Sequence, residues 1–382
     1  MNILMLNYEF PPIGGGASPV SYDIGKRIVE CGHRITVVTM AYGDLPLYEV
    51  KDGMDVYRVK CWRTQRMVCH PWEQATYIIL AYDFIKRKLQ ISDFDICYTH
   101  FIIPTGVISW LLKKKYNLSY IITAHGSDVI GHNNKRFRML YSLLKRPWCS
   151  IVSNASSVTS PSEHLINLMR MTESRAKYVL IPNGIDSAFF IKGKEKKKKI
   201  LIMCRLQETK NVQCIIRALS RIDLNGWVVD IVGDGPYREQ LKRLVEKYCL
   251  EQKICFRGWI INKSKEHLKV LQEAAIYISA SRVENCPTSI LEAIACGSNV
   301  LLSDIPAHRQ LIGNLDNNIY FAMDDDKQLS IKVQKLINEF NNGLTFSNSY
   351  DIRRFDWKNS IGKYLELLEK YADKNGVAGW KE

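Results

Sequence analysis

The sequence predicts an α/β protein built from two Rossmann-like domains, and three observations lead to that prediction. The chain has 382 residues, enough for about two domains of ordinary size. Short apolar runs typical of strands alternate with helix-like segments along the whole chain, the pattern of parallel sheets covered by helices. A run of charged residues at 193–199 interrupts this alternation near the middle, and we interpret it as an exposed linker.

The first half of the chain carries six strand-like runs. Each is a short apolar stretch, and the segments between them are longer and mix apolar with polar residues at helical spacing. The least patterned part lies at 40–74. The predicted strands are 2–6, 34–39, 94–98, 120–123, 157–159 and 178–181, and the clearest predicted helices are 18–30 and 73–90.

The same alternation restarts after the charged run. The last segment, 357–371, reads as a helix with Leu365, Leu367 and Leu368 on its apolar side. Before it we predict strands at 200–204, 227–232, 254–256, 276–280 and 300–303, and helices at 212–221, 236–248, 288–296 and 327–340. Ligands of open parallel sheets bind beyond the carboxyl ends of the strands, so residues just after each strand are the first candidates for a site.

Composition narrows the class of protein. The net charge of +14 and the isoelectric point of about 9.2 indicate an anionic partner, which could be nucleic acid, a phosphorylated substrate or an acidic membrane face. The eleven cysteines are scattered without a Cys-x-x-Cys pair, so we expect structural thiols rather than metal ligands or disulfides. Neither a run of about 20 apolar residues nor a secretory signal is visible, and we expect a cytoplasmic protein.

Two glutamates, Glu284 and Glu292, stand where a predicted strand gives way to a predicted helix. Pro287 suits the first helical position and Gly297 suits the C-terminal cap, so Glu284 belongs to the loop and Glu292 to the second helical turn. The first N–H groups of a helix lack intrahelical partners and attract anions, so residues 286–289 are suited to a diphosphate. The alternative is two surface glutamates beside an ordinary helix.

Cations and glycines also follow predicted strands. Arg205 and Lys210 come after 200–204, where two fixed cations would stabilise the charge of a departing diphosphate. In so basic a chain the alternative is two solvated surface residues. The glycines at 14–16 come after the first strand, and glycine lets the backbone approach a phosphate closely. A dinucleotide site is the rival interpretation, but the third glycine of that fingerprint is absent.

The order of these motifs resembles that of the retaining GT-B glycosyltransferases of family 4. Glu284 and Glu292, spaced as Glu-x7-Glu and followed by Ala-Ile-Ala-Cys-Gly, are similar to the family's donor-site motif. The resemblance covers nearly the whole chain and departs from the family at Cys204, where glycine is usual. Further matches, in order, are Pro11-Pro-Ile-Gly14-Gly15-Gly16, Ala124-His125-Gly126-Ser-Asp128, Pro182-Asn183-Gly184-Ile-Asp186, Arg205-Leu-x-x-x-Lys210, Val232-Gly233-Asp-Gly235-Pro and the region of Trp357.

The resemblance implies two Rossmann-like domains that face each other across a cleft. It implies an acceptor-binding domain at 1–190, a nucleotide-sugar-binding domain at 191–350 and, within 351–382, a helix that packs back on the first domain. It also implies sugar transfer with retention of configuration, without metal or cofactor, from a UDP- or GDP-type donor. The implied catalytic residues are His125, Arg205, Lys210 and Glu284, and the implied donor-binding residues are Gly14, Gly15, Gly16, Arg205, Lys210, Gly258, Trp259, Glu284, Asn285, Cys286, Pro287, Thr288 and Glu292.

Each implied residue has a role in this scheme. Arg205 and Lys210 would hold the leaving diphosphate, and the glycines at 14–16 would close over it. Glu292 would bind the ribose and residues near 256–259 would face the base. His125 would contact the transferred sugar or the acceptor, although a single histidine read without the family is more often structural.

The expected partners are the nucleotide-sugar donor and a glycan or lipid-linked acceptor of surface polysaccharide synthesis, with no nucleic acid. Basic and apolar residues interleave at 135–148 and 84–89, so we also expect contact with the anionic inner face of a membrane. The alternative is ordinary helices with a solvated face. Of two acidic clusters, 93–95 precedes an apolar strand and 324–326 opens a predicted helix, where capping explains it better than metal binding.

Three other functions stay open on the sequence. A nucleotide-sugar epimerase would use the same fold and convert its donor without an acceptor. A non-catalytic sensor would bind the donor without turning it over. A nucleic-acid-binding protein is favoured by charge alone, since the sequence has no recognisable nucleic-acid-binding motif.

Overall fold

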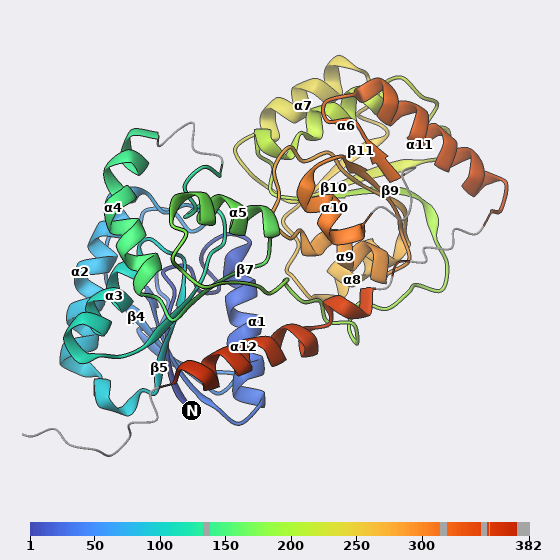
Figure 1. Ribbon diagram of the computed structural model, residues 1–382. Helices are drawn as coiled ribbons and strands as arrows, with labels where there is room; N and C mark the ends of the chain where they lie inside the picture. The colour runs from blue at the N-terminus through green and yellow to red at the C-terminus, as the bar shows by residue number, and fades with distance from the viewer. Residues whose placement is uncertain (133–137, 314–318, 345–349, 351, 373–382) are drawn as a thin grey trace, which may run out of the picture. The chain divides into compact units, whose positions relative to one another are not determined.

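The computed structural model describes residues 1–132, 138–313, 319–344, 350 and 352–372. The chain forms two compact units, one of Met1–Pro182 with Lys358–Glu382 and one of Asn183–Trp357. Each unit has its own parallel or mostly parallel sheet with helices on both faces (Figure 1). The predicted α/β fold with two Rossmann-like domains is therefore confirmed. The chain passes between units at 182/183 and 357/358, whereas the predicted divisions are at 190/191 and 350/351.

The sheet of the first unit has the strand order β3-β4-β2-β1-β5-β6-β7-β8 and is parallel except for the β3–β4 pair. Strand β5 is buried along its whole length, as expected for a parallel strand covered on both faces. The strands are β1 (Asn2–Leu6), β2 (Arg34–Met40), β3 (Tyr48–Lys51), β4 (Met54–Val59), β5 (Ile96–His100), β6 (Tyr120–Thr123), β7 (Ser157–Ser160) and β8 (Tyr178–Leu180).

Helices cover both faces of this sheet. On one face α2, α3, α4 and α5 contribute side chains to a core cluster that includes Leu4 and Leu6 of β1. On the other face Gly25 of α1 leaves room for Met5, and the ring of Tyr98 lies 5.8 Å from that of Tyr364 in α12. The helices are α1 (Ala17–Glu30), α2 (Pro71–Lys88), the short η1 (Ile91–Asp93), α3 (Thr105–Tyr116), α4 (Arg138–Asn154), α5 (Glu163–Thr172) and α12 (Trp357–Tyr371).

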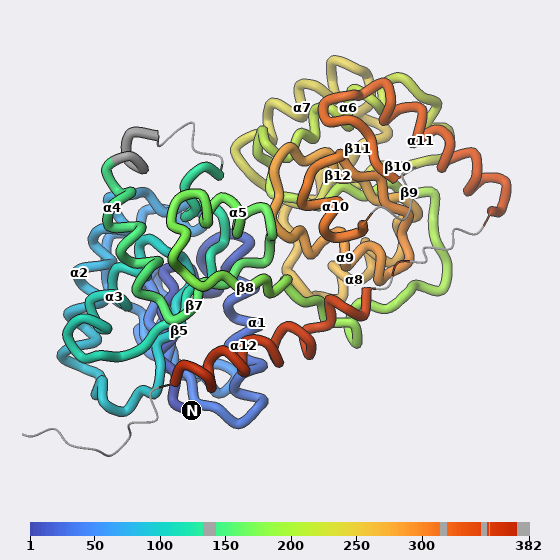
Figure 2. Tube along the Cα trace, viewed as in Figure 1, coloured from blue at the N-terminus to red at the C-terminus, as the bar shows by residue number. Residues whose placement is uncertain are grey.

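Helix α12 is last in the chain, yet its residues from Lys358 onward belong to the first unit. In Figure 2 it lies beside the N-terminal part of the chain. The hydroxyl of Ser360 donates to the carbonyl of Pro182 at 2.7 Å, and Tyr364 and Leu368 are buried. The first unit is thus assembled from both ends of the sequence.

The sheet of the second unit is parallel throughout its described pairs, with the order β11-β10-β9-β12-β13-β14. Helices α6, α7 and α11 cover one face, and α8, α9 and α10 cover the other. The elements are β9 (Lys197–Met203), η3 (Glu208–Lys210), α6 (Val212–Leu219), β10 (Val228–Val232), α7 (Arg238–Lys247), β11 (Ile254–Gly258), α8 (Lys265–Glu273), β12 (Ala274–Ser279), α9 (Thr288–Ala295), β13 (Asn299–Ser303), α10 (Pro306–Ile312), β14 (Tyr320–Phe321), α11 (Asp326–Asn341) and η5 (Ile352–Phe355).

The charged run at 193–199 is not simply an exposed linker, so that interpretation is wrong for its second half. Strand β9 begins at Lys197. Lys197 and Lys199 reach the carboxylate of Glu273 at 2.6 and 2.7 Å, and Lys196 donates to the carbonyl of Leu271 at 3.0 Å. Long lysine stems can pack along a protein surface while their ammonium groups find partners, so a run of lysines can begin a strand.

A β-hairpin lies in the part of the sequence that we found least patterned. Strands β3 and β4 pair antiparallel across Asp52 and Gly53, which have φ angles of 46° and 78°. An Asp-Gly pair with two positive φ angles is typical of the tight turns that connect antiparallel strands. This dipeptide was the available signal for the hairpin.

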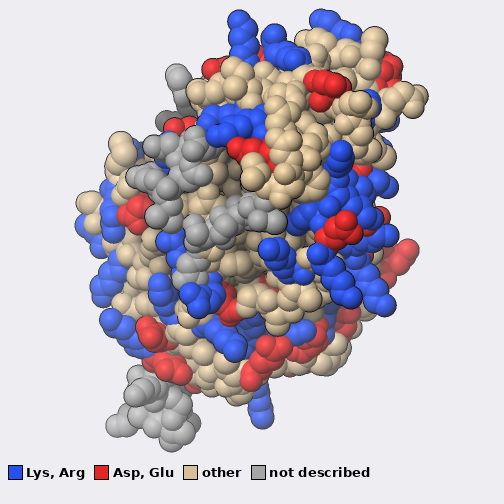
Figure 3. All heavy atoms as spheres, turned by 90° about the vertical axis from the view of Figure 1, so that its right-hand side faces the viewer, with Lys and Arg blue, Asp and Glu red and all other residues tan. Residues whose placement is uncertain are grey.

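The surplus of positive charge is visible on the surface. Figure 3 shows one face on which Lys and Arg side chains gather in groups, with Asp and Glu side chains among them. On this face the basic side chains form groups that acidic ones interrupt.

Candidate functional site

The predicted donor-site residues of the second unit follow the carboxyl ends of three strands. Arg205 and Lys210 follow β9, the segment 284–288 follows β12, and Gly258 with Trp259 ends β11. Strands β9 and β12 are neighbours in the sheet. The loops after them are joined by a hydrogen bond from the N–H of Arg282 to the carbonyl of Thr209, at 2.9 Å.

Lys210 and Glu284 form an ion pair. The Lys210 ammonium lies 2.5 Å from Oε1 of Glu284, and the two side chains are 21% and 12% exposed. The structure thus brings together two residues that are 74 positions apart in the sequence. A lysine ammonium has three donors, so Lys210 can keep this partner and still donate to a phosphate.

A polar network fixes the carboxylate of Glu284. The hydroxyl of Ser281 donates to Oε1 at 2.7 Å, and the carbonyl of Ser281 accepts from Ser303 at 2.5 Å. Burial by itself would raise the pKa of Glu284, but Lys210, His308 and Ser281 together hold the pKa below its ordinary value. Glu284 is therefore charged at neutral pH and can accept sugar hydroxyls.

Helix α9 has the ends that the sequence predicts, with one correction. Pro287 is the N-cap and Thr288 the first helical residue, so Pro287 lies one position earlier than expected. Gly297 has φ +86°, and the N–H groups of Gly297 and Ser298 donate back into the last turn, as in a Schellman motif. Glu292 lies in the second turn, as predicted.

Cys286 contributes its backbone rather than its thiol. The side chain is buried, and burial raises the pKa of the thiol to about 12. Its carbonyl accepts from Nδ2 of Asn183 at 3.5 Å. The neighbouring Asn285 completes the loop between Glu284 and Pro287.

Glu292 has a histidine partner. Its Oε2 lies 3.6 Å from Nε2 of His267, a buried residue of α8. Burial lowers the pKa of His267 to about 4, and its Nδ1 accepts from the N–H of Lys263 at 3.1 Å. With Nδ1 as the acceptor, the proton of the neutral ring is on Nε2, which lies 3.2 Å from Sδ of Met203 and 3.6 Å from the carboxylate.

The position of Arg205 depends on two glycines of the next loop. A Cβ at Gly233, which has φ +126°, would lie 1.9 Å from the carbonyl oxygen of Cys204. A Cβ at Gly235 would lie 2.3 Å from the carbonyl oxygen of Leu206. The backbone on either side of Arg205 therefore packs directly on the turn after β10, which only glycine permits.

Gly258 and Trp259 form the third part of this edge. The carbonyl of Gly258 accepts from the N–H of Gly233 at 2.7 Å, which ties it to the turn beside Arg205. Gly258 has φ +73°, and the side chain of Trp259 is 60% exposed. An exposed indole at this position offers a flat surface on which a base can stack.

The glycine-rich loop of the first unit is held by a buried carboxylate. Oε2 of Glu9 accepts from the N–H of Gly15 at 3.1 Å, and the N–H of Gly14 donates to the carbonyl of Arg66 at 2.9 Å. Arg63, whose side chain is fully buried, lies 3.7 Å from Glu9. Gly16 caps α1, so the loop leads directly into a helix N-terminus, where anions are stabilised.

His125 is paired with a second histidine. Nε2 of His125 lies 3.0 Å from Nδ1 of His100, the last residue of β5. Burial lowers the pKa of His125 to about 3 and the pKa of His100 well below its ordinary value, so both rings are neutral. The carboxylate of Asp128 accepts from the N–H groups of His125 and Gly126 at 3.0 and 2.9 Å and fixes the turn that carries His125.

The hydrogen bond between the two histidines has a preferred direction. Nε2 of His100 is buried with no hydrogen-bond partner in the structure. A buried N–H without a partner is costlier than a bare ring nitrogen, so the proton of His100 is on Nδ1, which donates to His125. His125 then carries its own proton on Nδ1.

The acidic clusters at 93–95 and 324–326 have structural partners. Oδ2 of Asp95 accepts from the N–H of Asn2 at 2.7 Å, and Asp324 is bound by Arg282 at 2.8 Å. Asp325 caps α11 through the N–H of Gln328, as predicted. Within the part of the chain that the structure describes, no group of three or more His, Cys, Asp or Glu side chains is arranged to hold a metal ion.

Sequence reasoning missed several residues of these two edges. His100 ends a strand that we predicted two residues too early, so its position after the strand was not recognised. His308 and His267 lie on helices of the second unit, and no sequence signal connects them to the glutamates they adjoin. Glu9 and Arg63 meet only through the folded chain.

The two units, each with a parallel or mostly parallel sheet covered by helices, define an α/β protein of the GT-B fold. Residues 14–189 match the model of Glycosyltransferase Family 4, and residues 185–344 match that of Glycosyl transferases group 1. The chain therefore belongs to the glycosyltransferases of the GT-B fold that are related to family 4.

Known relatives are similar over nearly the whole chain. An uncharacterized glycosyltransferase of Methanocaldococcus jannaschii is 23% identical over 94% of this chain and 95% of its own. A subunit of phosphatidylinositol N-acetylglucosaminyltransferase from Saccharomyces cerevisiae is 22% identical over 96% of this chain and 82% of its own. Both are named as glycosyltransferases, in agreement with the family models.

A solved structure shares the fold. The Anabaena protein HepE, in complex with UDP and glucose, has a TM-score of 0.77 and 16% identity over 97% of this chain and 99% of its own.

Among the described helices of the present chain, none has the length and apolarity needed to cross a membrane.

Proposed function

We propose that the chain is a retaining, metal-independent glycosyltransferase that uses a UDP- or GDP-type sugar donor. Its acceptor is a lipid-linked or growing glycan of surface polysaccharide synthesis, modified at the cytoplasmic face of a membrane. The observation that carries the donor site is the Lys210–Glu284 ion pair beside the start of α9. It combines a cation for phosphate, a carboxylate for hydroxyls and a helix N-terminus for anions within one unit.

The donor is held by residues of the second unit in this proposal. Arg205 and Lys210 bind the diphosphate together with the first N–H groups of α9, near Cys286, Pro287 and Thr288. The exposed Trp259 stacks on the base beside Gly258. A UDP-type nucleotide is supported by HepE, whose structure contains UDP and glucose.

In this proposal one carboxylate binds the transferred sugar and the other binds the ribose. Glu284, held by Ser281 and Lys210, accepts hydroxyls of the transferred sugar. Glu292 accepts the ribose hydroxyls, and the neutral ring of His267 lies beside its carboxylate. Each position suits hydroxyl donors, because the two oxygens of a carboxylate can accept several hydrogen bonds.

The first unit supplies the acceptor side. The glycine-rich loop 14–16 contacts the donor diphosphate, and His125 contacts the transferred sugar or the acceptor. A lipid-linked acceptor is supported by the yeast relative, whose name includes phosphatidylinositol.

The reaction proceeds by front-face transfer. The bond between the anomeric carbon and the donor phosphate oxygen breaks, and the acceptor oxygen forms its bond to the anomeric carbon on the same face. The departing phosphate takes the acceptor proton. Arg205 and Lys210 stabilise the charge that develops on the leaving group, so rate enhancement comes from positioning and electrostatics.

A thermal-shift screen tests the donor site. UDP, GDP, ADP, CMP and their common sugars are added without metal to wild type and to Glu292→Ala. A ligand at about 100 times its Kd stabilises a fold by about 2.7 kcal/mol. We expect one nucleotide family to stabilise wild type and to stabilise Glu292→Ala less.

A matched variant controls for general effects of a lost carboxylate. Glu339→Ala removes a carboxylate on α11 that is paired with the exposed Lys335. Glu339 is none of the proposed site residues. This variant should respond to the nucleotide as wild type does. No stabilisation of wild type by any nucleotide, or equal stabilisation of Glu292→Ala, would contradict the donor site.

A further inference from the structure

The outward face of α2 carries no charge over its first three turns. Residues 71–82 contain one charged side chain, Glu73, and it is buried. In contrast, Ile79 is 68% exposed, Trp72 48% and Leu80 41%. Since 24% of the chain is charged, a helix face that exposes large apolar side chains and no charge indicates an interaction surface.

The segment after β4 continues this surface. Trp62 is 69% exposed, and its ring lies 6.1 Å from that of Trp72, edge to face. Between this segment and α2 is a hollow of about 500 Å³, lined by Lys60, Cys61, Trp62, Thr76, Ile79 and Leu80.

The hollow favours hydrocarbon over sugar. The hydroxyl of Thr76 already donates to the carbonyl of Glu73 at 2.7 Å and accepts from the N–H of Trp62 at 3.3 Å. The rest of the lining is apolar apart from Lys60 and the thiol of Cys61. A sugar would lose hydrogen bonds to water here and could gain few beyond those of Lys60, whereas an acyl chain loses none.

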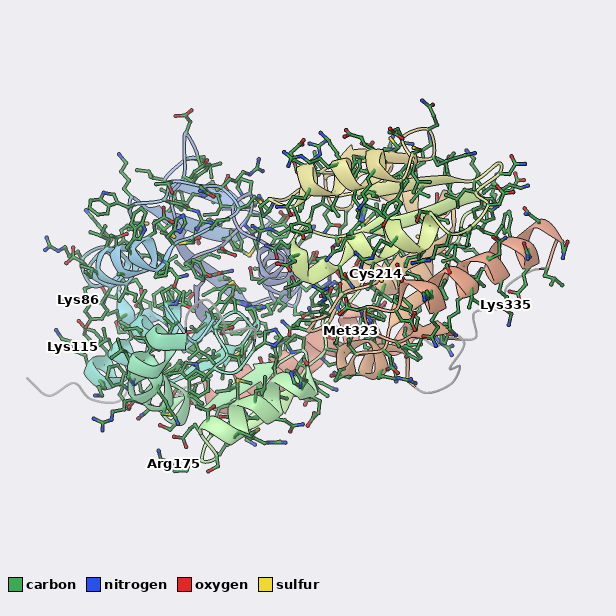
Figure 4. The ribbon with its side chains drawn as sticks, turned by 90° about the horizontal axis from the view of Figure 1, so that it is seen from above. Lys86, Lys115, Arg175, Cys214, Met323 and Lys335 are labelled. Carbon is green, nitrogen blue, oxygen red and sulfur yellow. The ribbon has the colours of Figure 1, made fainter. Side chains whose placement is uncertain are left out.

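Basic residues end the same helix. Lys86, Arg87 and Lys88 form the last turn of α2, and Lys113, Lys114 and Lys115 form the last turn of the adjoining α3. Lys86 and Lys115 both project outward from the same side of the first unit in Figure 4. The nearby carboxylate of Asp83 is paired with Arg87 at 2.7 Å, and the lysines of the two turns remain in excess. This end of the surface is therefore positive.

We propose that α2 and the segment 60–62 form a docking surface for an anionic lipid bilayer. Indole rings prefer the boundary between acyl chains and headgroups, and an amphipathic helix can lie in that plane with cations at the anionic headgroups. From Trp72 to Lys86 the helix spans about 21 Å, enough to present both parts at once. The exposed apolar half enters the bilayer, and the basic turns contact the headgroups.

This surface deepens the proposed membrane contact and therefore rests on it. Strands β4 and β6 are parallel members of one sheet, so Lys60 after β4 and His125 after β6 lie at the same edge. A bilayer bound at α2 would bring a lipid-linked acceptor to the edge that carries His125. Of the two segments predicted to contact a membrane, 84–89 contains the basic end of α2, and 135–148 lies partly outside the described residues.

Vesicle flotation tests the surface with the full chain. Phosphatidylcholine vesicles with and without phosphatidylglycerol are mixed with wild type at low salt. We expect binding that requires phosphatidylglycerol, and at least about a tenfold loss of binding in the double variant Trp62→Ser with Ile79→Ser, because two exposed apolar anchors are removed. Both side chains are more than two-thirds exposed, so the fold should tolerate these changes.

Ile331→Ser is the matched control. Ile331 is 71% exposed on α11 of the second unit, so the variant loses an equivalent apolar side chain elsewhere and should bind vesicles as wild type does. Nucleotide stabilisation is measured in every variant, and its retention separates failure of this surface from failure of the donor site. Wild type that stays in solution, or a double variant that still floats, overturns the proposal. Self-association that the double variant abolishes, without vesicle binding, also overturns it and identifies a second copy as the occupant.

Discussion

At the scale of single residues, charge pairs hold the candidate site in shape. Lys210 is the residue whose loss should affect activity most, because its ammonium adjoins Glu284 and lies where the leaving diphosphate is expected. Lys210→Ala should reduce turnover by about 100-fold or more, corresponding to about 2.7 kcal/mol of transition-state stabilisation.

The measurement is kcat with saturating donor, alongside the thermal midpoint. Lys335→Ala is the control, since Lys335 is an exposed lysine of the same unit, paired with Glu339 at 3.8 Å. It should keep wild-type turnover. A folded Lys210→Ala protein with unchanged kcat would refute the role of Lys210.

His100 is a positioning residue for His125 in our interpretation. His100→Phe removes the Nδ1–H that donates to Nε2 of His125, so the ring of His125 is no longer held in the tautomer with its proton on Nδ1. We expect kcat to fall about tenfold, an order of magnitude typical of a lost orienting contact, with little change in donor affinity.

A second substitution distinguishes orientation from packing. His100→Asn keeps an amide donor near the position of Nδ1 and should recover part of the activity that His100→Phe loses. Equal kcat values for the two variants would show that His100 only fills space.

At the scale of elements, loop backbones place the cations. The turn after β10 supports the Cys204–Leu206 backbone, and glycine is required there for space as well as for φ. Gly233→Ala should therefore reduce the free energy of unfolding by several kcal/mol and weaken nucleotide binding, since the backbone beside Arg205 has to move.

Gly226→Ala provides the comparison. Gly226 has φ +72°, and an added Cβ there meets its nearest neighbour, Lys198, only at 3.8 Å. Gly226→Ala should reduce the free energy of unfolding by about 1 kcal/mol, from backbone strain alone, and the variant should bind nucleotide as wild type does. Urea denaturation of both variants measures the difference, and similar losses would contradict the steric argument.

Element prediction from the sequence succeeded where patterns are local. Strands β1 and β6 and helix α12 have the predicted bounds, because apolar runs and helical spacing are properties of a few adjacent residues. Lys197–Lys199 were misread because their partner Glu273 is distant in the sequence. The placing of Lys210 and Glu284 at one site followed only from the resemblance to the family, and the histidine partners had no sequence signal.

At the scale of the whole molecule, buried histidines make stability depend on pH. Burial lowers the pKa values of His100, His125, His267 and His308, that of His125 to about 3 and that of His267 to about 4. The unfolded chain therefore binds more protons below about pH 6.5, and stability that is complete above that pH falls as the pH decreases. Asp128 acts in the opposite direction, since burial raises its pKa to about 6.

Four buried histidines outweigh one carboxyl group, so we expect the free energy of unfolding to fall by several kcal/mol between pH 7 and pH 5. Glu173 and Glu273, whose pKa values are lowered to about 2, change protonation only below about pH 4.5 and do not affect this interval. Urea midpoints at pH 7, 6 and 5 measure the effect. A constant midpoint would show that the histidines are solvated in the folded protein.

The return of α12 to the first unit has a consequence for synthesis on the ribosome. Met1–Pro182 emerges first but lacks Tyr364 and Leu368, which the finished unit buries. The second unit, a continuous stretch from Asn183 to Trp357, is translated in full before that helix appears. During translation the first unit therefore exposes the apolar surface that α12 later covers. We expect this surface to make the first unit the part of the nascent chain that depends most on a chaperone.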